Sequence, residues 1–175
     1  SAMAARLDLN GVEVNADAVI GDVDGGWAVL SKMLNAGRTG SAAEMVGVGT
    51  GAMDLTFDYL KQRKQFGRVI GEFQSLQHRA AQLYGEMEMA RSAVLKAQNF
   101  LDDEDPRAEL YASVAKAKAG LACSLSVREG VQMHGGIGMT DAHDSGRYMK
   151  RARVLEGLYG SESFHRDRYA RIGGY

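Results

Sequence analysis

The stretch from Leu76 to Leu101, LQHRAAQLYGEMEMARSAVLKAQNFL, decides the fold. Its apolar residues recur at alternating steps of four and three, which is the period of one face of an α-helix. This face consists of Leu76, Ala80, Leu83, Met87, Ala90, Val94, Ala97 and Leu101. A seam of this length is typical of a helix that packs lengthwise against others. The acidic run 102–105 is predicted to end the helix.

Helical patterns also lie on both sides of this seam. The preceding stripe begins after Trp27 and runs to KQRKQFG, where Gly67 is expected to cap the helix. After the seam, Asp105 and Pro106 form the N-cap and first-turn pair of a third helix. The predicted core face of that third helix is Leu110, Val114, Ala117, Leu121 and Leu125. A fourth helix is expected from about residue 141, and a short fifth segment over about 161–172.

Three long helices and a shorter fourth, joined by short loops, predict an all-α fold, an antiparallel up-down-up-down four-helix bundle. Residues 6–14, RLDLNGVEV, alternate apolar and polar side chains around Asn10 and Gly11, which predicts a short β hairpin before the bundle. A lone hairpin is marginal in water, so this one is expected to belong to a sheet outside the sequence. The expected division is therefore a hairpin segment over 1–25 and a helical domain over 26–175.

Composition excludes several classes of function. A net charge of -1 gives no electrostatic reason to expect nucleic acid or an acidic membrane surface as a partner. No apolar run reaches the roughly 20 residues of a membrane helix, so no membrane association is expected. The single cysteine, Cys123, cannot form an internal disulfide, which favours a reducing, cytoplasmic setting.

Two apparent site motifs have simpler structural explanations. Glu162 and His165 have the Glu-x-x-His spacing of a di-iron site, but no second pair supplies the other half, so no metal site is predicted. The run GVGTG at 47–51 follows no predicted strand and lies within a helical stripe, so its glycines indicate close helix packing rather than a dinucleotide fingerprint.

Two other motifs allow a binding role, although the residues alone favour a structural one. HGGIG at 134–138 falls at a helix end, where glycines more often cap the helix than offer backbone N–H groups to a phosphate. Arg63, Lys64 and Arg68 surround Phe66, a combination that suits a phosphate and an adenine but also a solvated helix end.

Taken together, these motifs resemble a known family. YLKQRKQFGRVIGEFQSLQHRAA at 59–81, followed by VQMHGGIGMT at 131–140, closely resembles the C-terminal helical domain of acyl-CoA dehydrogenases. The family pattern is Arg-x-x-Phe-Gly, then Phe-Gln, then Gln-x-x-Gly-Gly-x-Gly. The likeness runs from about Gly26 to the end, and the hairpin resembles the tail of the family's middle β domain.

The resemblance implies FAD-dependent α,β-dehydrogenation of an acyl-CoA thioester, an oxidoreductase activity of lipid metabolism. It also implies self-association as a dimer or tetramer, because the helical domain forms the dimer core and its flavin contacts reach the neighbouring subunit's cofactor. The fragment alone is expected to be inactive, since the other domains of the family are absent from it.

The same resemblance assigns cofactor contacts. Arg63 matches the arginine that pairs with the FAD pyrophosphate, Phe66 the aromatic residue beside the adenine, and Gln74 the glutamine that contacts the adenosine half. The segment along the adenosine diphosphate is matched by Gln132, Gly135 and Gly136. Ser161 matches the threonine that hydrogen-bonds the cofactor.

The catalytic base is missing from its usual place. An ungapped count from Gln132 puts Tyr159 where the family carries its glutamate, and a phenol is a poor base at neutral pH. Some members carry the base on the first helix just before an arginine, which matches Arg38 here, and Gly37 stands at that position. Glu156 is the alternative base, although using it requires a shift of register.

Glu44, on the first helix, is a weaker candidate for the base. Three functions therefore remain: an active dehydrogenase with a displaced base, a non-catalytic FAD-binding subunit that works with a homologous partner subunit, or a helical interaction module without a cofactor.

Overall fold

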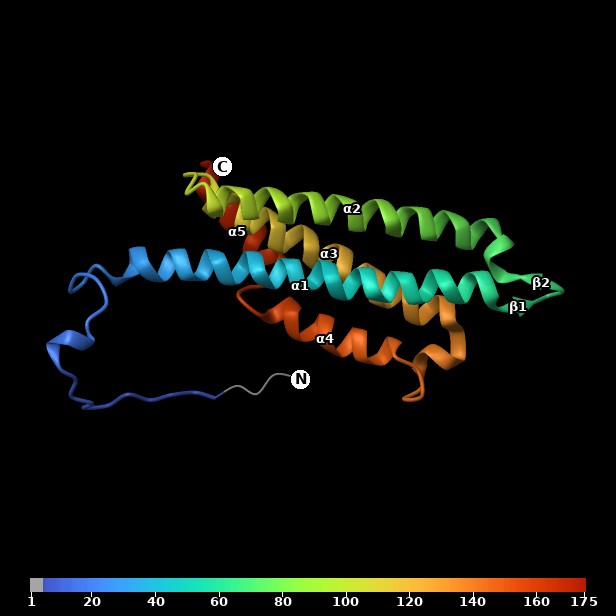
Figure 1. Cartoon of the computed structure of the whole chain (residues 1–175), viewed down its shortest axis with the longest axis horizontal. Coiled ribbons are helices and arrows are strands. Elements are labelled where there is room, and N and C mark those ends of the chain that lie inside the picture. The colour runs from blue at the N-terminus through green and yellow to red at the C-terminus, as the bar shows by residue number, and fades with distance from the viewer. Residues whose placement is uncertain (1–4) are drawn as a thin grey trace.

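The computed structural model describes residues 5–175 and shows a bundle of antiparallel helices. Figure 1 shows α1 to α4 running alternately in opposite directions, which confirms the predicted all-α four-helix bundle. The fifth helix, α5, packs against α3. The helices are α1 (Gly26–Gln62), α2 (Gln74–Asp102), α3 (Ala108–His134), α4 (Ser145–Gly157) and α5 (Glu162–Gly173). The strands are β1 (Lys64–Gln65) and β2 (Arg68–Val69), and the short 3-10 turns are η1 (Ala16–Ala18), η2 (Ile70–Glu72) and η3 (Gly135–Met139).

The seam on α2 faces the core as its spacing predicts. Its fully buried members are Leu83, Met87, Ala90, Val94 and Ala97. At the two ends of the seam, Leu76 and Leu101 are only half-buried, and Phe100 takes the inward position in the last turn. Burial of five consecutive seam residues fixes α2 lengthwise along its neighbours.

The predicted core face of α3 is wrong. Leu121 is 46% exposed, and the other members of that face are only half-buried. The buried face consists instead of Ala112, Ser113, Ala115, Lys116, Ala119, Ala122, Cys123, Ser126 and Val127. Because α3 contacts every other α-helix, its inward face needs small side chains that let helix backbones approach closely.

The start of α3 also differs from the prediction. The regular helix begins at Ala108, although Asp105 still acts at the start, because its Oδ1 accepts a hydrogen bond of 2.8 Å from the backbone N–H of Arg107. Likewise α4 begins at Ser145 rather than near residue 141, whereas α5 occupies the predicted fifth segment.

The predicted hairpin over 6–14 is also wrong. Residues 5–14 form no strand and are exposed, and a lone strand pair without a packing surface is marginal in water. Residues 1–4 of the expected 1–25 segment lie outside the described residues. Whether 1–25 and 26–175 are separate domains stays a prediction, although α1 does begin at Gly26.

A hairpin forms elsewhere, between α1 and α2. Strands β1 and β2 pair Lys64 with Val69 and Gln65 with Arg68. The turn residues Phe66 and Gly67 have φ angles of 54° and 77°, the left-handed values that a two-residue hairpin turn requires. Gly67 therefore turns the hairpin and does not cap α1, which ends at Gln62.

Gly49 in the GVGTG run lies where α1 passes close to α2 and α3. A Cβ at Gly49 would lie 2.8 Å from Met87 Cε and 3.2 Å from Cys123 Cα. Gly49 and Gly51 therefore serve close helix packing, Gly51 against Tyr148 of α4, as the sequence indicates, whereas Gly47 is exposed. Among residues 5–175, no helix is long and apolar enough to cross a membrane.

Candidate functional site

One end of the bundle brings together the hairpin and the glycine-rich segment. The C-terminal ends of α1 and α3 meet the hairpin and the start of α2 there (Figure 1). A core cluster of Leu60, Ile70 and Met133 joins these elements, with Phe73 packed against it. The cluster places six of the predicted cofactor residues on one end of the molecule, which is called the hairpin end below. They are Arg63, Phe66, Gln74, Gln132, Gly135 and Gly136.

Arg63 lies at the C-cap of α1 with its side chain exposed. Its backbone is fixed on both sides: its N–H donates to Tyr59 O at 2.9 Å, and its carbonyl accepts from Ile70 N–H at 2.8 Å. Within residues 5–175 its guanidinium forms no ion pair. A rigidly held arginine without an acidic partner is available to bind an anion such as a phosphate.

Phe66 presents an open aromatic face beside this arginine. Its side chain is 90% exposed, and its ring meets Phe73 edge-on at 6.1 Å between centroids. The Arg68 guanidinium lies over the Phe73 ring, 4.0 Å from its centroid, so Phe73 is held between Arg68 and Phe66. Gln74, the first residue of α2, is exposed next to them. An exposed ring held in place suits stacking against a planar ligand.

The glycine-rich segment leaves its backbone sterically open at the same end. Gly135 ends α3 with a φ of 66°, and a Cβ at either Gly135 or Gly136 would meet no atom within 4 Å. Gly138 differs, because its Cβ would lie 2.7 Å from Val131 O, so this glycine is needed for packing. Gln132 is exposed on the last turn of α3. Open glycines allow a ligand to approach the backbone closely.

A stack of three rings supports this segment from inside. The ring of buried His134 lies 4.4 Å from that of Tyr59 and 4.3 Å from that of His143, between centroids. His134 Nδ1–H donates to Gly130 O at 2.6 Å. Burial lowers the pKa of His134, so the neutral ring is favoured. The sequence interpretation missed this role of the two histidines.

A second group of predicted residues lies far from the hairpin end. Tyr159 follows α4 with a left-handed φ of 58°, and its ring lies against Gly37 of α1. A Cβ at Gly37 would lie 2.8 Å from Tyr159 Cζ. According to the resemblance, the family carries its base at position 159 or at position 37. These two positions are adjacent here, and the phenol ring of Tyr159 fills the space that a side chain at 37 would occupy. Gly37 and Arg63 are separated by roughly 40 Å along α1, at 1.5 Å per residue.

The two alternative carboxylates point elsewhere. Glu156 accepts a hydrogen bond of 2.6 Å from Arg153, one turn earlier on α4. Glu44 pairs with Arg151 across α1 and α4. Each carboxylate is thus held by an arginine rather than directed at the Tyr159 ring.

Ser161 belongs to the second group and caps a helix. Its Oγ accepts a hydrogen bond of 3.4 Å from the backbone N–H of Phe164 and lies 3.0 Å from Ser163 Oγ. Such a cap satisfies one of the free N–H groups at the start of α5. The structure therefore does not bring Ser161 to the other six predicted cofactor residues.

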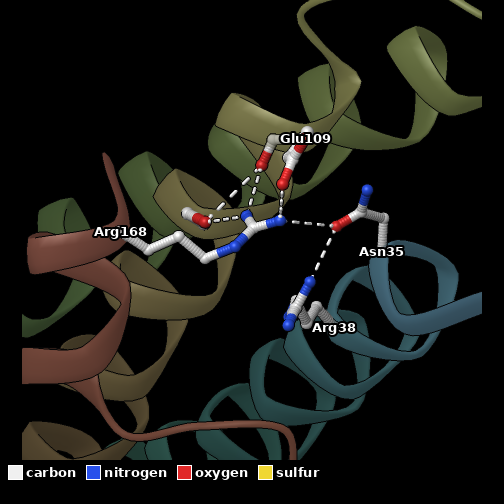
Figure 2. Close-up of polar contacts among 5 residues, drawn as sticks. Asn35, Arg38, Glu109 and Arg168 are labelled. Carbon is white, nitrogen blue, oxygen red and sulfur yellow. Dashed lines mark hydrogen bonds and ion pairs between the residues drawn. The ribbon is translucent and has the colours of Figure 1, made fainter. Parts of the chain in front are cut away.

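A buried polar network that the sequence reasoning missed joins Arg168 of α5 to α1 and α3 (Figure 2). Arg168 of α5 donates to Ser113 Oγ at 2.6 Å, to the carboxylate and main-chain carbonyl of Glu109, and to Asn35 Oδ1 at 3.2 Å. Asn35 Oδ1 also accepts from Arg38 at 2.9 Å. Burial lowers the pKa of Arg38, and the charge of Arg168 lowers it further. The network ties α5 to α1 and α3 beside Gly37.

Comparison with known proteins gives the family. The family profile described as "Acyl-CoA dehydrogenase, C-terminal domain" matches residues 24–173. The mitochondrial short/branched chain specific acyl-CoA dehydrogenase of Bos taurus is 35% identical over 143 residues, which cover 82% of this chain and 33% of that protein. The chain belongs to the acyl-CoA dehydrogenase family and corresponds to its C-terminal helical domain.

Two further comparisons agree with this. The CarC subunit of the caffeyl-CoA reductase-Etf complex of Acetobacterium woodii is 33% identical over 82% of this chain and 38% of its own. The butyryl-CoA dehydrogenase structure from Megasphaera elsdenii superposes with a TM-score of 0.81 at 28% identity, covering 86% of this chain and 39% of that one. The chain therefore spans little more than a third of the length of these relatives.

Within the described part of the chain, no group of three or more histidine, cysteine, aspartate or glutamate side chains lies close enough to hold a metal ion. Glu162 and His165, the pair with di-iron spacing, diverge in the structure. His165 is fully buried, whereas Glu162 pairs with Arg166.

Proposed function

We propose that this chain is the C-terminal domain of an FAD-dependent acyl-CoA dehydrogenase that carries out α,β-dehydrogenation of an acyl-CoA thioester. In this proposal the domain supplies a binding surface for FAD and a surface for self-association. The observation that carries the proposal is the hairpin end, where an unpaired arginine, an open aromatic ring and two open glycines gather.

These residues fit the adenosine diphosphate half of FAD. The Arg63 guanidinium would bind the pyrophosphate by charge-assisted hydrogen bonds. The Phe66 ring would lie beside the adenine with Gln74 near the adenosine, and the backbone at Gly135 and Gly136 would lie along the phosphates with Gln132. The flavin, when bound, accepts the β-hydrogen of the substrate as a hydride.

The distance between the two groups supports self-association. One group lies at the hairpin end and the other around Tyr159, roughly 40 Å apart along α1. We infer that the hairpin end contacts the cofactor of a neighbouring subunit, while the Tyr159 region faces the reacting end of this subunit's own cofactor. A dimer or tetramer follows from this division.

A second candidate function is a non-catalytic FAD-binding subunit that works with a homologous partner subunit. It is favoured by the Tyr159 region, where a phenol fills the volume of both base positions and the nearby carboxylates are bound by arginines. The relative CarC is itself named as a subunit of a larger complex. In this case the α-proton would be removed by a carboxylate of the partner subunit.

Replacement of Arg63 by alanine in the full-length protein tests the cofactor site. Hydrogen bonds to charged groups contribute about 1.5–3 kcal/mol, so we expect FAD to bind about 10- to 100-fold more weakly. The measurement is the flavin absorbance per protein after dialysis against graded FAD. Arg91→Ala is the matched control, because Arg91 is an exposed arginine of α2 whose ion pair, within residues 5–175, is with Glu88 on the same helix.

Equal flavin affinity in the Arg63→Ala protein and the wild type would contradict the assignment of the hairpin end. If the full-length wild type bound no FAD at all, the third alternative, a helical interaction module without a cofactor, would replace the proposal.

A further inference from the structure

The loop that carries Tyr159 is held by a buried lysine. Lys116 lies in the middle of α3 and is 2% exposed. Its Nζ donates to Leu155 O at 2.9 Å, in the last turn of α4, and to Gly160 O at 3.1 Å, just after Tyr159. One ammonium therefore joins the end of α4 to the loop that follows it. A lysine near a helix C-terminus satisfies carbonyls that have no partner within the helix.

This position is unusual for a lysine. A buried ammonium costs free energy unless hydrogen bonds replace its water, and Lys116 forms no ion pair with a carboxylate in the described residues. Burial lowers the pKa of Lys116, and the charge of Glu156 partly opposes this. The hydrogen bonds that compensate burial of the ammonium are those to Leu155 O of α4 and Gly160 O of the loop, so a change in the loop would remove one of the two.

A second buried side chain, that of His165, binds the carbonyl of Tyr159, which lies between those of Leu155 and Gly160 in the sequence. His165 of α5 is fully buried, and its Nε2–H donates to Tyr159 O at 3.1 Å. The carbonyls of residues 155, 159 and 160 are thus all fixed by side chains from α3 and α5. Gly160 has a φ of 110°, and a Cβ there would lie 2.4 Å from Phe164 Cδ1. The backbone on both sides of the Tyr159 side chain has little freedom.

We propose that Lys116 is the positioning residue for the side chain at 159. By holding Leu155 O and Gly160 O, it maintains the left-handed turn that directs this side chain onto Gly37. The catalytic meaning of this role rests on the proposed function: whichever side chain stands at 159 meets the reacting region only while Lys116 fixes the loop. Tyr159 itself touches Gly37, whereas Lys116 acts only through the loop.

A fluorine probe tests the positioning without any assay of activity. In the full-length protein, 3-fluorotyrosine is placed at residue 159 alone, and its ¹⁹F resonance is recorded with Lys116→Met and with Lys118→Met. Lys118 is the matched control, since it lies on the same helix and pairs with Glu86 of α2, away from the loop. We expect Lys116→Met to move the resonance toward that of free fluorotyrosine, and Lys118→Met to leave it unchanged.

An unchanged resonance in the folded Lys116→Met protein would overturn the proposal. If Lys116→Met fails to fold, the ¹⁹F resonance of Lys116→Gln tests the proposal instead, because its neutral amide keeps a hydrogen-bond donor on a shorter side chain. A shift of this resonance smaller than that of free fluorotyrosine supports positioning by the hydrogen bonds, and an unchanged resonance overturns the proposal. These results do not depend on flavin or substrate, so they remain valid if the proposed function fails.

A kinetic arm tests the catalytic meaning separately. Tyr159→Glu restores a carboxylate at the family position, and its turnover of an acyl-CoA is compared with and without Lys116→Met. Misplacing a catalytic group by about 1 Å costs on the order of 100-fold, so kcat should fall 10- to 100-fold while KM changes little. Lys118→Met should change neither constant. Equal kcat values with and without Lys116→Met would refute the catalytic role, and absence of turnover in Tyr159→Glu itself would count against the proposed function.

Discussion

At the scale of single residues, His165 holds the Tyr159 loop by a hydrogen bond that requires its neutral ring. Burial lowers the pKa of His165 to about 4 from 6.5, and the hydrogen bond to Tyr159 O only partly opposes this. The charges of Lys116, Arg38 and Arg168 lower it further. The folded chain therefore keeps this ring neutral, and Nε2 carries the proton that the carbonyl requires.

The sign of the pH dependence follows from this shift. Between pH 6.5 and about 4 the unfolded chain binds a proton at residue 165 that the folded chain does not. The free energy of unfolding should therefore fall as the pH drops through this window, and His165 should contribute about 3 kcal/mol to the loss. Urea unfolding across this range measures it.

Two variants isolate the contribution of His165. His165→Gln removes the titrating group, so its stability should depend less steeply on pH in this window than that of the wild type, whatever its absolute stability. His78→Gln, at an exposed histidine of α2, is the matched control for the substitution itself. A His165→Gln slope equal to that of the wild type would show that the ring is not held neutral.

At the scale of elements, the bundle depends on small residues where α1 passes α2 and α3. Gly49 faces Met87 of α2 and Cys123 of α3, and a methyl group there would crowd the end of the Met87 side chain and lie 3.2 Å from the backbone of Cys123, which would have to shift by a few tenths of an ångström. Gly47, two residues earlier on α1, is exposed, and a Cβ there would meet nothing within 4 Å. Close packing therefore restricts the side chain at position 49 and does not restrict the one at position 47.

Substitution of each glycine by alanine should change stability in opposite directions. Gly49→Ala overpacks the contact and should lower the free energy of unfolding by about 1–3 kcal/mol. Gly47→Ala adds helix propensity at an exposed site and should raise it by up to about 1 kcal/mol. Urea denaturation of the two variants beside the wild type measures both. Stabilisation by Gly49→Ala would mean that α1 does not approach its neighbours this closely.

At the scale of the whole molecule, the two groups of predicted site residues lie too far apart to meet at one place on the chain. If both groups contact FAD, as proposed, the hairpin end contacts the FAD of another subunit. The full-length protein should therefore sediment as a dimer or tetramer at micromolar concentration. Arg63→Ala should keep this assembly state while binding FAD more weakly, because Arg63 forms no ion pair in the described chain. Sedimentation as a monomer only would refute the shared-cofactor arrangement.

The sequence by itself determined the helices, the bundle and the positions of the motif residues. The period of four and three along α2 is a local property, since every apolar residue of the seam lies within one turn of the next. The hairpin end was likewise predictable in its parts, because each motif lies at a helix end that capping and glycine chemistry mark. Arg63 and Phe66 are indeed exposed there.

Only the tertiary structure decided which surfaces and which distant residues meet. The buried face of α3 is set by the closeness of its neighbours, which favours Ala115 and Ala119 over Leu121 although leucine is more apolar. The hairpin over 6–14 did not form: residues 5–14 are exposed, and a short strand pair is stable only when it packs against another surface. The contact of Tyr159 with Gly37 and the hydrogen bonds of Lys116 join residues far apart in sequence. No local pattern contains them, because packing and burial are properties of the assembled helices.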